Sequence, residues 1–141
     1  MVQSFVKIGD TVYSQSESVY DSLGNVLLST QIERLATAVG TGALTLATGR
    51  YQSSAMWYDG AGRSIASANY GTNGGVVLVR PATVPARIDN VLVTETKYDL
   101  TSGRAYGTID PAGREHRTFV DALGRTVKTV ANYTGSGVVS A

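Results

Sequence analysis

His116 is the only histidine in the chain and therefore the first residue to test for acid–base chemistry. A histidine base needs a positioned nucleophile and a carboxylate that orients its ring. The sequence has many serines, but no Gly-x-Ser-x-Gly elbow that would position one of them as a nucleophile. His116 also lies between Glu115 and Arg117 on a segment expected to be a strand. A packed or solvent-facing strand histidine is therefore our interpretation.

Two carboxylates, Asp110 and Glu115, flank one expected turn and could approach each other. Hydrolysis by paired acids requires a cleft around a sugar, and an array of hairpins offers no obvious one. A single histidine, no cysteine and scattered acids argue against a metal site. No phosphate-binding Gly-x-x-x-x-Gly-Lys loop occurs. We therefore assign no catalytic residue, no cofactor and no metal ligand, and we do not expect an enzyme.

The aromatic residues allow one kind of binding chemistry. Trp57 and the eight tyrosines could form a face on which sugar rings stack. The same side chains would equally serve to pack a β-sheet. A cell-surface module that binds carbohydrate or protein is therefore the alternative function, with Trp57 as its candidate glycan-stacking residue.

The most regular pattern in the chain is an Asp, a short spacer and a Gly-Arg pair. It occurs three times between Lys97 and Tyr133, at Asp99, Asp110 and Asp121. An Asp that opens a turn can accept hydrogen bonds from the backbone that follows it, and a closing Gly supplies a positive φ that other residues resist. Short alternating segments lie on either side of each copy, so each copy predicts a β-hairpin.

Two earlier copies begin at Tyr20 and Tyr58. These tyrosines are 38 positions apart, Tyr58 and Tyr98 are 40 apart, and the copies at Asp99 and Asp121 are 22 apart. We interpret these intervals as one or two multiples of a unit of about 20 residues, which is typical of repeat architectures. The residues assigned to the repeated turns are Tyr20, Asp21, Gly24, Tyr58, Asp59, Gly62, Arg63, Tyr98, Asp99, Gly103, Arg104, Asp110, Pro111, Gly113, Arg114, Asp121, Gly124 and Arg125.

The alternation of Tyr-Asp-x-x-Gly-Arg with Asp-Pro-x-Gly-Arg resembles the YD-repeat or Rhs (rearrangement hotspot) family. That family includes bacterial polymorphic toxins, the shell-forming subunits of insecticidal toxin complexes and the animal teneurins. The resemblance is strongest from Tyr98 to Tyr133. The sequence departs from the pattern at Asn25, which replaces Arg, at Val120, which replaces Tyr, and in the longer spacer after Asp99.

The resemblance implies ribbons of β-hairpins that spiral into a hollow shell, which in bacterial members encloses a toxic C-terminal domain. On this basis we expect an extracellular or cell-surface protein in which the chain contributes wall strands to a shell or ribbon that encloses or displays a separate effector domain. The expected partners are further YD repeats of a parent chain, or second copies that pair through open sheet edges.

The segment Asp110-Pro111-Ala112-Gly113 also resembles the site at which some members of that family cleave themselves. Here Arg114 replaces the apolar continuation and another repeat follows. We interpret the segment as an ordinary turn, because Pro presets φ at the second turn position.

Composition excludes several further partners. The net charge of +1 provides no electrostatic footprint for nucleic acid and no polybasic patch for a membrane surface. No apolar run reaches membrane-spanning length. The N-terminal residues lack a basic segment followed by an apolar core, so no signal peptide is visible. Together with the family resemblance, this implies a piece of a longer protein, or a larger protein whose export signal lies elsewhere.

The overall expectation is an all-β array of antiparallel β-hairpins that forms a twisted ribbon, a segment of a β-spiral shell. Sixteen glycines among many Ser, Thr and Val residues favour strands and turns over long helices. The array is expected to occupy residues 1–141, with weaker repeats in 1–90, insertions near 36–50 and 71–87, the strongest repeats in 91–133 and a flexible tail at 134–141.

Two expectations concern the inserted segments. Residues 36–49 follow neither a helical nor a strand period, and three glycines disfavour a helix there. Asn73-Gly74 fits the two positive-φ positions of a type I′ turn, so Val76–Val79 after it is expected to be a buried strand. Pro81 and Pro85 then bracket a connection.

Overall fold

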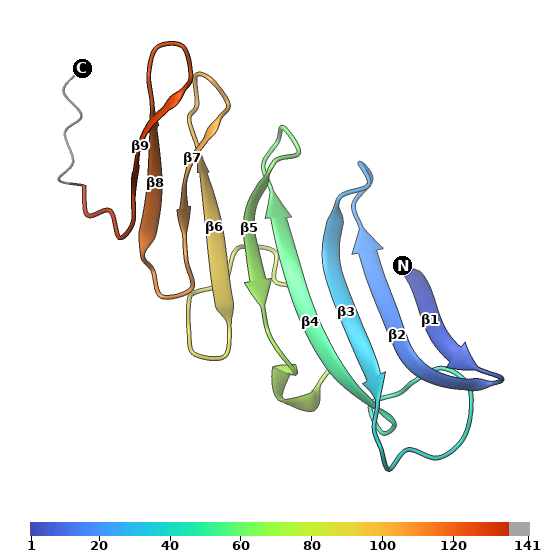
Figure 1. Ribbon diagram of the computed structural model, residues 1–141. Coiled ribbons are helices and arrows are strands. Elements are labelled where there is room, and N and C mark those ends of the chain that lie inside the picture. Colours follow the sequence, from blue (N-terminus) through green and yellow to red (C-terminus); the bar gives the residue numbers. More distant parts are fainter. Residues whose placement is uncertain (136–141) are drawn as a thin grey trace.

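The computed structural model describes residues 1–135 and shows one open sheet of nine antiparallel strands (Figure 1). The strands follow one another in chain order across the sheet, so every strand pairs with its sequence neighbours. An all-β fold built of antiparallel hairpins is therefore confirmed. The strands are β1 (Val2–Ile8), β2 (Thr11–Tyr20), β3 (Val26–Arg34), β4 (Gly49–Tyr58), β5 (Ser64–Asn69), β6 (Leu92–Tyr98), β7 (Ala105–Ile109), β8 (Glu115–Val120) and β9 (Thr126–Val130).

The four turns between β2 and β3, β4 and β5, β6 and β7, and β8 and β9 lie along one end of the sheet, at the top in Figure 1. We call them the upper turns. They comprise Asp21–Gly24, Asp59–Gly62, Asp99–Gly103 and Asp121–Gly124. The other connections lie at the opposite, lower end: a tight turn at Gly9-Asp10, a long connection at 35–48, another at 70–91, and the turn Asp110–Gly113.

This arrangement corrects our interpretation of the repeat spacing. Each interval between successive upper turns contains two strands, whether it is 38, 40 or 22 residues long. The longer intervals are therefore not two units of about 20 residues. They are one unit each, lengthened by the lower connections 35–48 and 70–91, and those connections correspond to the insertions expected near 36–50 and 71–87.

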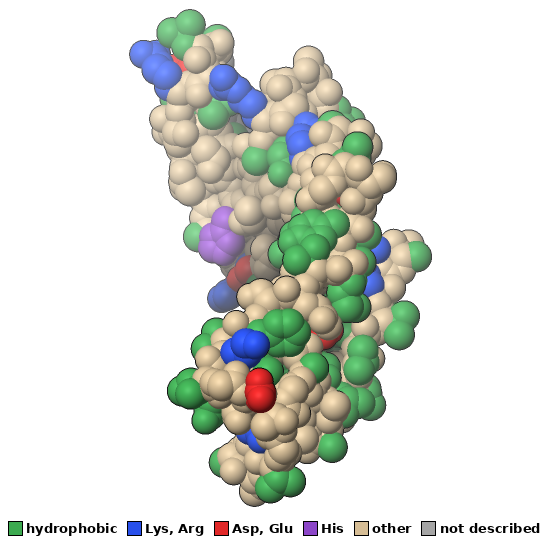
Figure 2. All heavy atoms as spheres, turned by 90° about the vertical axis from the view of Figure 1, so that its right-hand side faces the viewer, with side chains coloured by type: hydrophobic (Ala, Val, Ile, Leu, Met, Phe, Trp, Pro, Cys, Tyr) green, Lys and Arg blue, Asp and Glu red, His purple; other side chains and the backbone are tan. Residues whose placement is uncertain are grey.

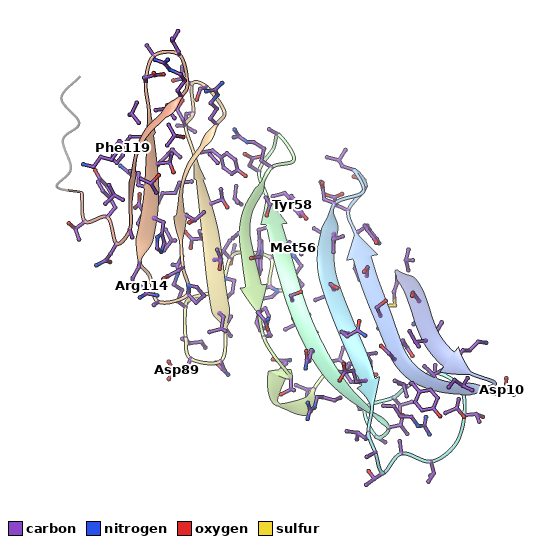
Figure 3. All side chains as sticks on the ribbon, viewed as in Figure 1. Asp10, Met56, Tyr58, Asp89, Arg114 and Phe119 are labelled. Atoms are coloured by element: carbon purple, nitrogen blue, oxygen red, sulfur yellow. The ribbon has the colours of Figure 1, made fainter. Side chains whose placement is uncertain are left out.

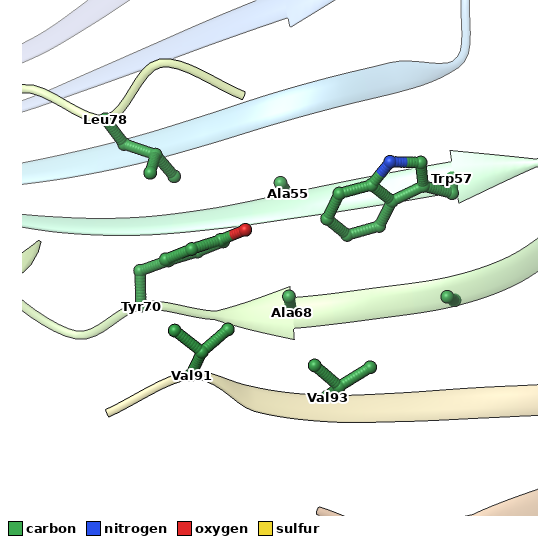
Figure 4. Packing of buried hydrophobic residues seen from close by; sticks show 8 residues of the cluster. Ala55, Trp57, Ala68, Tyr70, Leu78, Val91 and Val93 are labelled. Carbon is green, nitrogen blue, oxygen red and sulfur yellow. The ribbon is translucent and has the colours of Figure 1, made fainter. Parts of the chain in front are cut away.

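The connection 70–91 folds over one face of the sheet, which we call the covered face, and creates the main core there. Its residues Tyr70, Leu78 and Val91 pack with side chains of the strands beneath (Figure 4). Trp57 lies in this core and is only 4% exposed. The strand members of the cluster are Ala55 and Trp57 of β4, Ala66 and Ala68 of β5, and Val93 of β6.

The expected strand at Val76–Val79 is wrong. The segment has no strand structure, and only Leu78 is buried, whereas Val79 is 86% exposed. The positive φ angles expected at Asn73 and Gly74 are present, but they belong to the 3₁₀ turn η1 (Asn73–Gly75). The reason lies in the sheet, because β6 already occupies the ladder position beside β5, and Ser67 pairs with Thr94 there.

The other long connection, 35–48, closes a smaller core at the lower end of the sheet. Its Leu44 packs with Val12 of β2 and Ile32 of β3. Gln15, which is buried, accepts a hydrogen bond from the Leu44 backbone N–H at 3.0 Å through Oε1. Gly49 begins β4 at this point because a Cβ there would stand 2.5 Å from Ile32.

After β9 the chain turns back over the preceding strand. The Tyr133 backbone N–H donates to the Glu115 carbonyl at 2.7 Å, and its ring meets Phe119 edge to face, with 5.8 Å between ring centroids. Of the expected flexible tail at 134–141, residues 136–141 lie outside the described part of the chain. No helix in the described residues is long and apolar enough to cross a membrane.

Candidate functional site

Every upper turn is held by the carboxylate of its Asp and by a glycine with positive φ. In the turn at Asp59, the Gly62 N–H donates to the Asp59 carbonyl at 2.9 Å, and the Ala61 and Arg63 N–H groups donate to Asp59 Oδ1 at 3.0 and 2.9 Å. Gly62 has a φ of 76°. These are the features of a hairpin loop that combines a β-turn with a left-handed glycine.

The other turns follow the same scheme with local differences. The loop at Asp99 has one more residue, and its Gly103 N–H donates to the Asp99 carbonyl at 2.9 Å. There the Ser102 hydroxyl donates to Asp99 Oδ1 at 2.8 Å. The closing glycines Gly24, Gly62, Gly103, Gly113 and Gly124 have φ angles of 87°, 76°, 71°, 80° and 78°.

Each Asp carboxylate is also held in its charged form. Hydrogen bonds from Arg63 hold the pKa of Asp59 below its ordinary value, with the side-chain bond contributing most. The pKa of Asp121 is lowered chiefly by the backbone N–H of Arg125, and that of Asp99 by the backbone N–H of Ser102. For Asp21 the largest lowering of the pKa comes from the Asn25 side chain, and for Asp110 from the Arg114 backbone N–H.

The four upper hairpins share a β-bulge at the same place. The residue before Asp pairs with the second residue after Gly, and the next residue of the outgoing strand is left out of the register. The residues left out are Leu27, Ile65, Tyr106 and Val127. The lower turn at Asp110 has no such irregularity, since Ile109 pairs with Glu115 and Thr108 with His116 in unbroken register. A bulge increases local twist.

The repeated tyrosines connect each upper hairpin to the one before it. The Tyr58 hydroxyl donates to the Val26 carbonyl at 3.0 Å, and the Tyr98 hydroxyl donates to the Ser64 carbonyl at 3.0 Å. Each acceptor is the second residue after the Gly of the preceding turn. Tyr58 lies near the upper end of β4 in Figure 3. The tyrosine of the motif is therefore a contact between hairpins and not a part of its own turn.

The repeated arginines connect each hairpin to the one after it. Arg63 Nη1 donates to the Gly103 carbonyl at 2.9 Å, and the Arg63 guanidinium lies over the Tyr98 ring at 4.5 Å from its centroid. Arg104 Nη1 similarly reaches the Gly124 carbonyl at 3.4 Å. A Cβ at Gly103 would stand 3.2 Å from Arg63, and one at Gly124 would collide with Arg104. These arginines can therefore approach closely because Gly103 and Gly124 have no side chain.

Two departures from the motif, Asn25 and Val120, each remove one of these contacts, whereas the longer spacer after Asp99 leaves the bond from Arg63 to Gly103 in place. Asn25 donates to Asp21 at 2.8 Å, and a Cβ at Gly62 would meet no side chain of the preceding hairpin, unlike a Cβ at Gly103 or Gly124. Val120 has no hydroxyl with which to reach back to β7. The lower turn keeps only the local half of the motif, because Arg114 pairs with its own Asp110 at 2.7 Å at the opposite end of the sheet (Figure 3).

Sequence reasoning missed a row of charges on the covered face of β6–β8. Glu115 forms ion pairs with Lys97 at 2.6 Å and Arg117 at 2.7 Å, and these partners lower its pKa. Gly107 lies between them on β7, where a Cβ would stand 3.5 Å from the Glu115 carboxylate and 3.1 Å from the His116 carbonyl. A glycine at the centre of a strand is the sequence signal for such an approach.

The structure also shows the surroundings of the residues that were considered for acid–base chemistry. His116 is about half exposed and visible in Figure 2, with Nε2 3.9 Å from Asp110 Oδ2. Asp110 and Glu115 each face cations instead of forming an acid pair.

Trp57 donates from Nε1 to the Pro81 carbonyl at 3.3 Å and has the Arg80 guanidinium 4.9 Å from its ring centre. The indole therefore presents no open face to a sugar, which corrects its assignment as a glycan-stacking residue.

Within residues 1–135, no group of three or more His, Asp or Glu side chains is placed to hold a metal ion. A scan against protein-family models finds no match for the chain, and a search of curated proteins finds none either.

Proposed function

We propose that this chain is a structural segment of a YD-repeat wall, in which sheets grow by the addition of hairpins edge to edge. Such a wall, in a shell or an extracellular ribbon, encloses or displays a separate effector domain. The observation that carries the proposal is the pair of contacts that recurs between successive upper hairpins. Tyrosine reaches back to a strand carbonyl, and arginine reaches forward to a turn glycine.

This arrangement supports a wall because it is directional and can be repeated without limit. A lone hairpin is marginal in water. Side by side, hairpins supply each other's ladder partners, as the repeats of other linear arrays do. Both β1 and β9 have a strand on one side only in the described sheet, so two edges are open to further strands.

The alternative is a cell-surface module that binds carbohydrate or protein, with Trp57 as its candidate stacking residue. Because Trp57 lies beneath the connection 70–91, glycan stacking on Trp57 has no observation in its favour, and we favour the wall.

Sedimentation velocity over a wide range of concentration tests the proposal. Open edges pair with other copies, and like edges (β1 with β1, or β9 with β9) can do so in antiparallel order. We expect concentration-dependent association that is weakened by Gln3→Pro in β1 and Thr129→Pro in β9, since the backbone N–H of each residue faces the open edge in the antiparallel register and proline removes that donor. Leu100→Lys, at an exposed turn residue away from both edges, is the control. A compact monomer at every concentration, or association that neither proline affects, would contradict the proposal.

A further inference from the structure

The contacts between upper hairpins follow a positional rule. Tyrosine at the position before Asp donates to the carbonyl of the second residue after the preceding turn's Gly, which is Val26 or Ser64. Arginine after Gly donates to the next turn's Gly carbonyl, as Arg63 does to Gly103. The rule therefore states which atoms any hairpin must present in order to join the row.

At the β9 edge the chain presents the arginine donor that this rule requires. Arg125 follows Gly124, and its Nε donates to Asp121 Oδ2 at 2.7 Å. Arg63 forms the same bond to Asp59 at 2.8 Å while its Nη1 reaches forward to the next turn. The Arg125 side chain is 74% exposed, and no strand of residues 1–135 pairs on the far side of β9.

The backbone of β9 presents the carbonyl acceptor that the rule requires. Thr126 is the second residue after Gly124, the place that Val26 and Ser64 occupy in the earlier hairpins. The register is also the same, because Val120 pairs with Thr126 and the bulge follows, as Tyr58 pairs with Ser64. The Thr126 carbonyl is therefore the equivalent of the two carbonyls that accept from Tyr58 and Tyr98.

We infer that the β9 edge is a docking site for a β-hairpin whose turn begins with Tyr-Asp and closes with Gly. The incoming tyrosine hydroxyl donates to the Thr126 carbonyl, the guanidinium of Arg125 donates to the incoming glycine carbonyl, and the incoming strand pairs antiparallel with β9. This inference rests on the proposed wall function and adds to it the chemistry by which the next hairpin is selected.

Charge supports the register that the rule imposes. In the chain, Ala66 of β5 pairs with Glu95 of β6, and Ala66 is the fourth residue after its turn glycine. The corresponding residue of β9 is Lys128. A hairpin like β6–β7 on the β9 edge would therefore place a glutamate opposite Lys128, and opposite charges directly across a ladder are stabilising.

A second copy of the chain does not meet the rule at this edge. Because all neighbouring strands are antiparallel and the strand numbers differ by an even number, β1 and β9 run in the same direction. If the upper turns of another copy lay at the same end of the sheet, its β1 edge would pair parallel to β9, and within the described residues no upper turn adjoins β1 to offer a glycine. The occupant is therefore a separate hairpin and not the β1 edge of another copy.

The test uses the full chain and a peptide of residues 92–109, which carries Tyr98 and Gly103. Its ends are joined by a short Gly-Ser linker so that it stays a hairpin. Titration is followed by NMR of the ¹⁵N-labelled chain. We expect shifts concentrated on β9 and the turn at Asp121, and an affinity reduced about tenfold by Arg125→Ala in the chain or by Tyr98→Phe in the peptide. Arg114→Ala, at an arginine with the same local carboxylate bond but at the lower end, should leave the affinity unchanged.

The outcomes separate the inference from the proposed function. If the peptide binds at β9 with an affinity that neither Arg125→Ala nor Tyr98→Phe alters, then edge pairing stands and the selection rule is overturned. If no shift occurs at β9 at the highest soluble peptide concentration, the edge does not accept a hairpin, and both proposals fail. Arg125 is exposed enough that its replacement leaves the fold intact, which the amide spectrum of the variant verifies.

Discussion

Arg63 and Gly103 lie 40 positions apart in the chain, and the Arg63 guanidinium donates to the Gly103 carbonyl at 2.9 Å. The arginine belongs to the turn between β4 and β5, and the glycine closes the turn between β6 and β7. The same arginine lies over Tyr98, whose hydroxyl returns to Ser64 beside it. Two hairpins that are distant in sequence are thus joined at one end of the sheet by three contacts.

The first prediction concerns this contact. Arg63→Ala should lower the free energy of unfolding by about 1–2 kcal/mol, since it removes a charged hydrogen bond between hairpins and a cation–π contact. Arg114→Ala should cost less, because Arg114 is more exposed and bonds only within its own turn. Urea denaturation of both variants provides the measurement. Equal losses would mean that the contact between hairpins adds nothing to the local one.

The second prediction concerns close packing at the lower core. Gly49→Ala should destabilise the protein by about 1–3 kcal/mol, because its Cβ would press on Ile32 and stand 3.3 Å from Leu44. Gly60→Ala is the matched control, since no atom lies within 4 Å of the added Cβ and its φ is ordinary. Thermal unfolding of the two variants should therefore differ clearly. Similar melting temperatures would contradict the close contact of Gly49 with Ile32 and Leu44.

The fold was largely predictable because its turn chemistry is local. Asp at the start of a turn and Gly at its end act on the backbone within a few residues, so the turn positions could be located without knowing the sheet. Strand order followed as well, since each strand pairs with its neighbour in sequence. The direction in which Tyr58 and Arg63 reach could not be predicted, because it depends on which residues the sheet brings alongside.

The predictions that were wrong also concern features that depend on distant parts of the chain. Val76–Val79 has the composition of a buried strand, but β4 and β6 occupy both ladder positions beside β5, and the segment crosses the covered face instead. Trp57 was considered for sugar stacking because its burial depends on the connection 70–91, whose path no local pattern shows. The repeat length was misjudged for a similar reason, since both long connections lie at the lower end and leave the upper row regular.

The third prediction uses the single tryptophan of the chain. Because Trp57 is buried beneath the connection 70–91, its fluorescence should be blue-shifted relative to free tryptophan and weakly quenched by acrylamide. Arg80→Ala should increase quenching, since Arg80 both stacks on the indole and donates to the Met56 carbonyl at 2.8 and 3.0 Å. Emission like that of free tryptophan in the unmodified chain would contradict the placement of the connection.

The fourth prediction is a pH dependence. The turn aspartates have pKa values below their ordinary range in the folded chain, because backbone and side-chain donors stabilise the carboxylates. A lowered folded pKa contributes stability above the unfolded value, about 3.9 for Asp, and that stability is lost as pH falls through the folded value. The free energy of unfolding should therefore be level above about pH 5 and decline below about pH 4.

Asp59→Asn provides the control for this dependence. The amide oxygen can still accept the two backbone hydrogen bonds that Oδ1 receives, whereas the NH2 group cannot accept those from the Arg63 side chain. Because the amide does not titrate, the variant should be less stable at neutral pH and should show a shallower decline in acid than the unmodified chain. Chemical denaturation at a series of pH values measures the difference. A profile that stays level into strong acid in the unmodified chain would show that the turn carboxylates do not gain stability on folding.

The most direct test of the account is whether successive hairpins lie side by side and join through their upper turns. NMR of the labelled chain should show nuclear Overhauser contacts between the Arg63 side chain and the Tyr98 ring, together with cross-strand contacts between Ser67 and Thr94. The account predicts both sets. Cross-strand contacts confined to each hairpin, with none between β5 and β6 and none from Arg63 to Tyr98, would contradict it.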